Sequence, residues 1–202
     1  MHRAWAYQKN QRQGAQSNVD FAGSFAKVLA MPQTATQLEP PDSHHLLAAH
    51  GWLELNNAAE AGEEIARISP ENLEHPDVLE ARWAVCAAGE RWEAGLNVAD
   101  TLLRVAPDRA SGWLHRAYAL RRVKAGGLQR AWDALRPGYD KFPKAEVIPY
   151  NLACYAAQMG RLDEAWEWLH KSMEAAGDVD VIKTMALGDK DLDALWDRIR
   201  AL

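Results

Sequence analysis

The sequence has few of the features that mark exported, membrane-spanning or nucleic-acid-binding proteins. Its two cysteines, Cys86 and Cys154, lie far apart and form no CxxC pair, which favours free thiols in a reducing compartment. No run approaches the roughly 18 apolar residues of a membrane span, and no secretory-type leader is recognised. The formal net charge is −5, whereas nucleic-acid binding normally needs a basic surface. We therefore expect a cytoplasmic protein with neither a membrane nor a nucleic acid as its partner.

The common motifs of catalysis and of metal or cofactor binding are also missing. There is no Gly-rich phosphate loop, no HExxH and no nucleophile elbow. His44, His45 and His50 share one predicted helix, but no Cys or second cluster completes a metal-binding set. A catalytic Cys154 would need a positioned histidine, and nothing orients His170 on the paired helix. We therefore expect no enzymatic activity, no metal and no cofactor.

What the sequence does contain is clearest at residues 150–169, YNLACYAAQMGRLDEAWEWL. Apolar residues recur at i, i+3, i+4 and i+7 on either side of Gly160, which is the spacing of one helix face. Gly160 suits the end of a first helix, and Pro149 suits its first turn. The join is so short that the two helices must be antiparallel neighbours. Since such a pair has apolar groups on more than one side, it needs further pairs to cover it.

This stretch resembles a tetratricopeptide repeat, a motif with a period of about 34 residues. The matching positions, in the order of the family pattern, are Tyr150, Leu152, Ala153, Gly160, Leu162 and Ala165. Looser copies place Ala61, Ala94 and Ala131 as counterparts of Ala165, at intervals of 33, 37 and 34 residues. The longest interval indicates an expanded turn around residues 124–127. The order of short motifs is also similar to a group of bacterial tetratricopeptide proteins of unassigned activity, although Lys190 stands where those proteins usually have Pro.

Residues 1–42 differ from the rest of the chain. The first 17 residues are polar and Gln-rich, which favours partial disorder. A short helix is predicted at residues 18–29 and a linker at residues 32–41. Because the resemblance begins only after the linker, a natural translation start at Met31 is a second interpretation. We therefore predict a tail at residues 1–42 and one domain at residues 43–202, which includes a cap at about 175–202.

The resemblance implies an all-α fold, a right-handed solenoid of about four helix pairs with a C-terminal capping helix. Asp42 or Ser43 is expected to cap the first helix, and Asp77 the third. The third pair is expected at residues 110–124 and 128–135, with Pro137 stopping its second helix. A closing helix is expected from Asp178, and a last helix at residues 191–202 would cover the final apolar face of the row.

The resemblance also implies where a partner would bind, because first helices of tetratricopeptide pairs line a concave face that holds peptides. The residues carried over to that groove are Leu79, Trp83, Leu114, Tyr118, Arg121, Arg122, Tyr150, Asn151 and Cys154. Tyr, Trp and Arg most often carry interface energy, and the two arginines favour an acidic segment. The alternative is that Trp83 and Tyr118 pack between repeats while both arginines are ordinary solvated charges.

Two functions from different classes follow from this pattern. The first is a non-catalytic scaffold or adaptor that binds a peptide or protein segment in the groove. The second is a structural protein that forms a homo-oligomer through the ends of the solenoid or through its N-terminal helix. Both rest on fold-level analogy and residue type, because no motif in the sequence names a partner.

Overall fold

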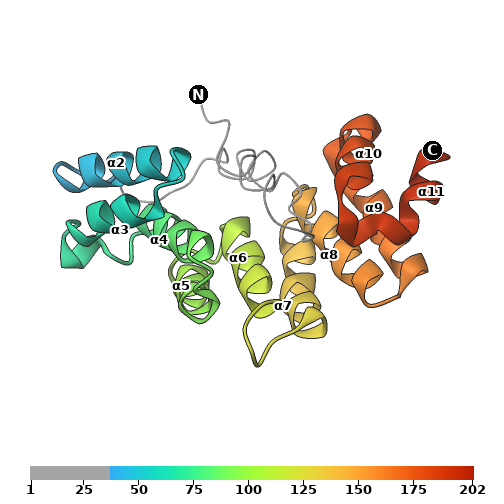
Figure 1. The fold of residues 1–202 in the computed structure, drawn as a ribbon, viewed down its shortest axis with the longest axis horizontal. Helices are drawn as coiled ribbons and strands as arrows, with labels where there is room; N and C mark the ends of the chain where they lie inside the picture. The colour runs from blue at the N-terminus through green and yellow to red at the C-terminus, as the bar shows by residue number, and fades with distance from the viewer. Residues whose placement is uncertain (1–36) are drawn as a thin grey trace.

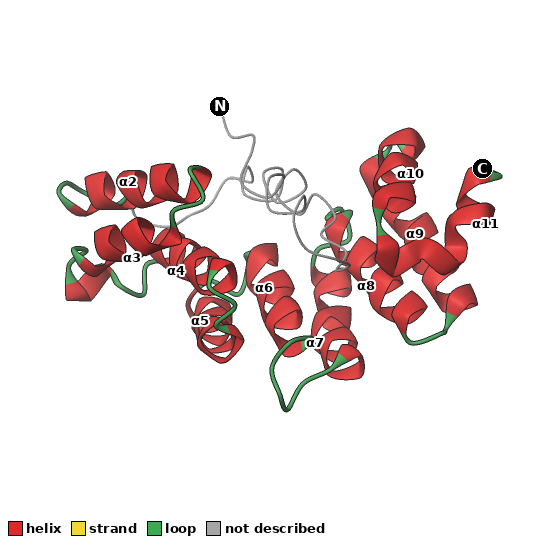
Figure 2. Cartoon of the chain, viewed as in Figure 1, coloured by secondary structure: helices red, strands yellow, loops and turns green. Residues whose placement is uncertain are grey.

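The computed structural model describes residues 37–202, and within them all of the regular secondary structure is helical (Figures 1 and 2). This part contains ten α-helices, two short 3-10 helices and no strand, which confirms the all-α class. The predicted helix at residues 18–29 and the alternative start at Met31 lie outside the described residues. None of the helices between residues 37 and 202 has the length and apolar character needed to cross a membrane.

Eight of the helices form four consecutive pairs. Their bounds are α2 (Asp42–Glu54) and α3 (Ala58–Ala66), α4 (Pro76–Ala88) and α5 (Trp92–Val105), α6 (Ala110–Leu120) and α7 (Leu128–Lys141), and α8 (Val147–Gln158) and α9 (Leu162–Ala176). The 3-10 helix η2 (Pro70–Asn72) connects the first two pairs, and α10 (Val179–Gly188), η3 (Lys190–Leu195) and α11 (Trp196–Arg200) follow the last. Each α-helix packs against the next one along the chain, so the helices form a curved row from α2 to α11 (Figure 1).

The small residues of the repeat pattern lie where the two helices of a pair meet. Ala61, Ala131 and Ala165 have no exposed surface. In the second pair the expected residue, Ala94, is exposed, and Gly95 is buried instead. A Cβ on Gly95 would lie 3.6 Å from the Cβ of Cys86. The second pair is therefore aligned on Gly95 instead of Ala94. This change brings the intervals between the small residues closer to a period of about 34 residues.

The turns inside the pairs follow the same repeat. Asn56, Glu90 and Gly160 have positive φ angles of 56°, 54° and 76° at equivalent turns in pairs one, two and four. The third pair has the predicted longer turn, between Leu120 and Leu128. There a Cβ on Gly126 would lie 1.8 Å from the backbone oxygen of Leu120, so only glycine fits this turn.

Two predictions about the third pair are wrong. Helix α6 ends at Leu120 rather than at residue 124, and α7 continues through Pro137 to Lys141. An internal proline costs a helix about 3 kcal/mol, but here the last turn of α7 is held by packing. Gly138 lies under Trp113, and the ring of Tyr139 meets that of Trp168 edge-on at 5.0 Å. Tertiary packing therefore offsets the local cost of the proline.

The predicted caps also need correction. Asp42 makes no cap on α2; its carboxylate accepts hydrogen bonds from Ser69 and from the Asn72 amide, which join α2 to the connector before α4. On α4 the cap is His75, whose Nδ1 accepts from the backbone N–H of Asp77. Asp178 does begin the closing helix, by capping α10. The last segment is a 3-10 helix followed by a short α-helix rather than one helix at residues 191–202.

Candidate functional site

Most of the residues predicted to line a groove are buried. Leu79 and Leu114 expose 0% and 1% of their surface and belong to the hydrophobic core. Trp83, Tyr150 and Asn151 are each at least nine-tenths buried, as is Cys154. The expectation that these six side chains face an open groove is therefore corrected. These side chains lie where neighbouring helices of the row pack together. For Trp83 this agrees with the alternative interpretation, in which it packs between repeats.

Arg121 is half-buried, and its charge is matched inside the chain. Its guanidinium donates two hydrogen bonds to the carboxylate of Asp191 in η3, one of them 2.9 Å long between Nη2 and Oδ1. Burial alone would lower the pKa of Arg121, but the hydrogen bond and charge of Asp191 raise it. A paired, charged Arg121 is thus a structural contact with the C-terminal cap rather than one half of a basic floor.

Arg122 has a different environment, against two aromatic rings that also contact each other. Its guanidinium carbon lies 3.4 Å from the ring centroid of Tyr118 and 5.0 Å from that of Trp92. Nη1 donates to the backbone oxygen of Tyr118 at 3.0 Å. Burial and the neighbouring charge of Arg121 lower the pKa of Arg122, although Tyr118 opposes them. Among residues 37–202 no carboxylate lies within ion-pair distance of Arg122.

Trp92, Tyr118 and Arg122 are all half-buried and together form what we call the Arg122 surface. The three side chains come from the start of α5, from the last turn of α6 and from the turn after it. The sequence predicted Tyr118 and Arg122 as groove residues but did not include Trp92. The i, i+4 spacing of Tyr118 and Arg122 was a readable signal, whereas the approach of Trp92 depends on how α5 packs against α6.

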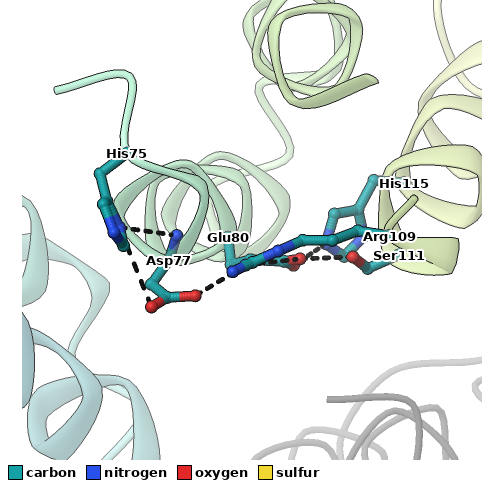
Figure 3. Close-up of polar contacts among 6 residues, drawn as sticks. All are labelled: His75, Asp77, Glu80, Arg109, Ser111 and His115. Carbon is teal, nitrogen blue, oxygen red and sulfur yellow. Dashed lines mark hydrogen bonds and ion pairs between the residues drawn. The ribbon is translucent and has the colours of Figure 1, made fainter. Parts of the chain in front are cut away.

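A buried polar network between α4 and α6 was not predicted from the sequence (Figure 3). Glu80 on α4 is its centre and exposes only 9% of its surface. One carboxylate oxygen lies 2.6 Å from Nε2 of His115, and the other accepts the hydroxyl of Ser111. Arg109 lies 2.7 Å from a carboxylate oxygen of Asp77 and 3.9 Å from Glu80. Burial by itself would raise the pKa of Glu80, but His115, Ser111 and Arg109 together lower it.

The geometry of this network is that of a structural contact. In a nucleophilic site the base must reach the hydroxyl that it activates. Here Ser111 and His115 both bind Glu80, which stands between them. The imidazole of His115 also stacks on Trp83 at a centroid distance of 3.8 Å. The network therefore holds the first helices of the second and third pairs together and presents no activated serine.

A second buried network fixes the C-terminal segment to α8. The carboxylate of Asp189 accepts from the hydroxyl of Tyr150 at 3.1 Å, from the thiol of Cys154 at 3.3 Å and from the backbone N–H of Asp191. Burial raises the pKa of Asp189, and burial together with the two aspartates raises that of Cys154. A thiol with a raised pKa stays protonated and is a poor nucleophile. The cap, rather than a groove, thus accounts for Tyr150 and Cys154.

The histidines on α2 do not gather into a ligand set. Nδ1 of His45 lies 2.9 Å from a carboxylate oxygen of Glu64 on α3, while His44 is exposed. In the described part of the chain no group of three or more His, Cys, Asp or Glu is placed to hold a metal ion.

A scan against models of known protein families gave no match to this chain, and a search of curated proteins gave none either.

Proposed function

We propose that this protein is a non-catalytic, tetratricopeptide-like scaffold of the cytoplasm that binds an acidic protein segment through the Arg122 surface. The observation that carries the proposal is the position of Arg122. Its charge lies against two aromatic rings and forms no ion pair with a carboxylate of residues 37–202. Asp77, Glu80 and Arg121, by contrast, are already used in contacts within the chain.

The solenoid part of the proposal rests on the repetition of the helix pairs. Consecutive pairs recur at close to the tetratricopeptide period, and each helix packs against its neighbour in the chain, as in repeat proteins. Cys86 and Cys154 are free and buried, which agrees with a reducing compartment. The concave side of such a solenoid would be formed by the first helices, which include α6.

The acidic partner follows from the chemistry of the guanidinium group. Stacking on Tyr118 and Trp92 holds the plane of Arg122 in place, so little side-chain entropy is lost when a ligand binds. Within the guanidinium of Arg122, only Nη1 donates a hydrogen bond to a backbone oxygen. The remaining N–H groups can bind a carboxylate. Aromatic residues beside an arginine are also the composition of interface hot spots.

The test is affinity capture from a lysate of the source cells, with Arg122→Glu as the deficient bait. Arg136→Glu is the matched control, because Arg136 is also near two aromatic rings, Tyr139 and Trp168, but lies on α7. We expect a protein captured by the wild type and by Arg136→Glu and lost with Arg122→Glu. Calorimetry with peptides from that protein should place binding in an acidic segment. Equal capture by all three baits would contradict the proposal.

Arg121 is left unchanged in this test for a structural reason. A glutamate at position 121 would lie against Asp191 and would break the contact between α6 and the cap. A loss of binding would then report unfolding rather than a missing ligand contact. Self-association is a second candidate function, and it is favoured by two exposed leucines at the first pair, Leu47 on α2 and Leu55 just after it.

A further inference from the structure

The end of α6 brings together two consecutive arginines and one buried carboxylate from the C-terminal segment. Arg121 donates two hydrogen bonds to Asp191, which exposes only 8% of its surface. Arg122, the next residue, lies against the rings of Tyr118 and Trp92. Two positive charges and one negative charge leave these three charged side chains with a single net positive charge.

Asp191 is fixed in this position by contacts of its backbone. Its N–H donates to the carboxylate of Asp189 at 2.9 Å, and its carbonyl oxygen accepts from the side-chain amide of Gln158 on α8 at 3.1 Å. The next residue, Leu192, is fully buried in the core. The negative charge of Asp191 is therefore held at the end of α6.

The charges of Arg121 and Asp191 both act on Arg122. Burial lowers the pKa of Arg122, the charge of Arg121 lowers it further, and the charge of Asp191 raises it. A carboxylate bound to Arg122 would thus be attracted by both arginines and repelled by Asp191. The first anionic group of a ligand balances the net positive charge. A second one beside it would meet the carboxylate of Asp191 with no cation left to balance it.

The other neighbours of Arg122 are aromatic. The ring centroids of Trp92 and Tyr118 are 5.7 Å apart, and both side chains are half-buried. Trp83 contacts Tyr118 edge-on at a centroid distance of 5.8 Å and supports that ring from the core. Partly exposed rings gain from contact with apolar groups. The residues that flank the bound acidic side chain are therefore expected to be apolar.

We propose that Asp191 is a specificity-determining residue of the Arg122 surface. It makes that surface select a segment with one acidic side chain between apolar residues over a segment with several adjacent acidic or phosphorylated side chains. This inference rests on the proposed function and names the kind of segment that is bound. Without Asp191, two adjacent guanidinium groups would favour a polyanion. A repulsive group that excludes the wrong ligand is a common source of specificity.

NMR titration of the full chain with two peptides of equal length tests the selection. One peptide has a single glutamate between two leucines, and the other has three consecutive glutamates in place of this triplet. The signal followed is the indole N–H of Trp92, which Trp92→Phe identifies. We expect the wild type to bind the single-glutamate peptide more tightly, and Arg122→Gln to weaken the binding of both peptides.

Asp191→Asn tests the residue itself. Its amide oxygen can still accept from Arg121, so the contact with the C-terminal segment is kept while the negative charge is removed. We expect the preference for the single-glutamate peptide, measured as the ratio of the two dissociation constants, to fall at least about threefold. Asp193→Asn removes an exposed charge from the same 3-10 helix and should leave the ratio unchanged. A merely loosened C-terminal segment would weaken both peptides alike.

The possible failures of this test are distinguishable. A wild type that binds the three-glutamate peptide equally or more tightly overturns the selection and leaves the proposed function intact. A ratio that Asp191→Asn does not lower has the same meaning. If neither peptide changes the Trp92 signal, the proposed function is overturned, and this inference with it.

Discussion

Arg121 and Arg122 are consecutive in the chain, yet their guanidinium groups lie in different environments. Arg121 is paired with Asp191, and Arg122 lies against the rings of Tyr118 and Trp92. Neighbouring residues of a helix end point in directions about 100° apart, so identical side chains can serve different purposes. The sequence showed two equivalent cations, whereas in the structure only Arg121 forms an ion pair with a carboxylate of residues 37–202.

Asp189 gives a prediction at the scale of a single residue. Burial raises its pKa above the ordinary value of 3.8, so the folded state binds a proton more tightly than the unfolded state. The stability of the wild type should therefore fall as the pH rises from about 4 through the raised pKa. Asp189→Asn should lack this loss, since its amide oxygen can accept from the Asp191 N–H while its NH2 group donates to the Tyr150 hydroxyl.

Urea unfolding of both proteins between pH 3.5 and 7 measures this effect. The free energy of unfolding of Asp189→Asn relative to the wild type should increase towards pH 7. Asp193→Asn, in the 3-10 helix that Asp189 caps but exposed, is the control and should give a curve nearly parallel to that of the wild type. Parallel curves for Asp189→Asn as well would mean that the buried carboxylate makes no contribution to the pH dependence.

At the scale of an element, the turns inside the pairs are more regular than the helices that they join. Equivalent turns place Asn56, Glu90 and Gly160 in the left-handed region. Glycine adopts these backbone angles without strain and asparagine does so readily, but glutamate adopts them only with steric strain. The second pair therefore has the same turn as the first and fourth pairs, with a residue that is unfavourable there.

Glu90→Gly should stabilise the protein for this reason. Relief of the left-handed strain exceeds the added flexibility of the unfolded chain, and we expect a net gain of about 0.5–1 kcal/mol. The exposed side chain of Glu90 leaves little else to lose. Thermal or urea unfolding measures the change, with the exposed helical residue Glu93→Gly as a control that should lose stability. A destabilised Glu90→Gly would show that the turn is held by contacts other than its own backbone.

Helix α7 shows why the end of a helix cannot always be predicted from the local sequence. Pro137 favours a helix end in any local reading of the sequence, but the helix continues to Lys141. The contacts that hold its last turn come from Trp113 and Trp168, which are distant along the chain. A pattern confined to one helix cannot include such partners.

At the scale of the molecule, the two proposed contact surfaces lie on different parts of the row. The exposed leucines Leu47 and Leu55 belong to the first pair, and the Arg122 surface belongs to α5, the end of α6 and the turn after it. Because each helix of the row packs mainly against its neighbours, changes in one surface should leave the other intact. Leu47→Glu should therefore capture the same partner as the wild type, and Arg122→Glu should self-associate normally. Loss of both properties in either variant would indicate one shared surface or a loss of folding.

The long-range polar contacts are also a property of the whole molecule. Arg121 reaches Asp191 across 70 positions, and Glu80 reaches His115 across 35. They join the first helices to one another and to the C-terminal segment. They also explain why several residues expected at a binding site are used within the fold.

The sequence alone determined the helical class, the positions of the four pairs and the expanded third turn, because helix periodicity and turn residues are local properties repeated along the chain. It also indicated which residue types were available for binding. The tertiary structure decided which of these residues are exposed to a partner. Leu79 and Leu114 are part of the core, Asp191 pairs with Arg121, and Trp92 and Tyr118 both contact Arg122. The physical reason is that exposure and ion pairing depend on side chains brought together from distant helices, and spacing within one helix does not contain that information.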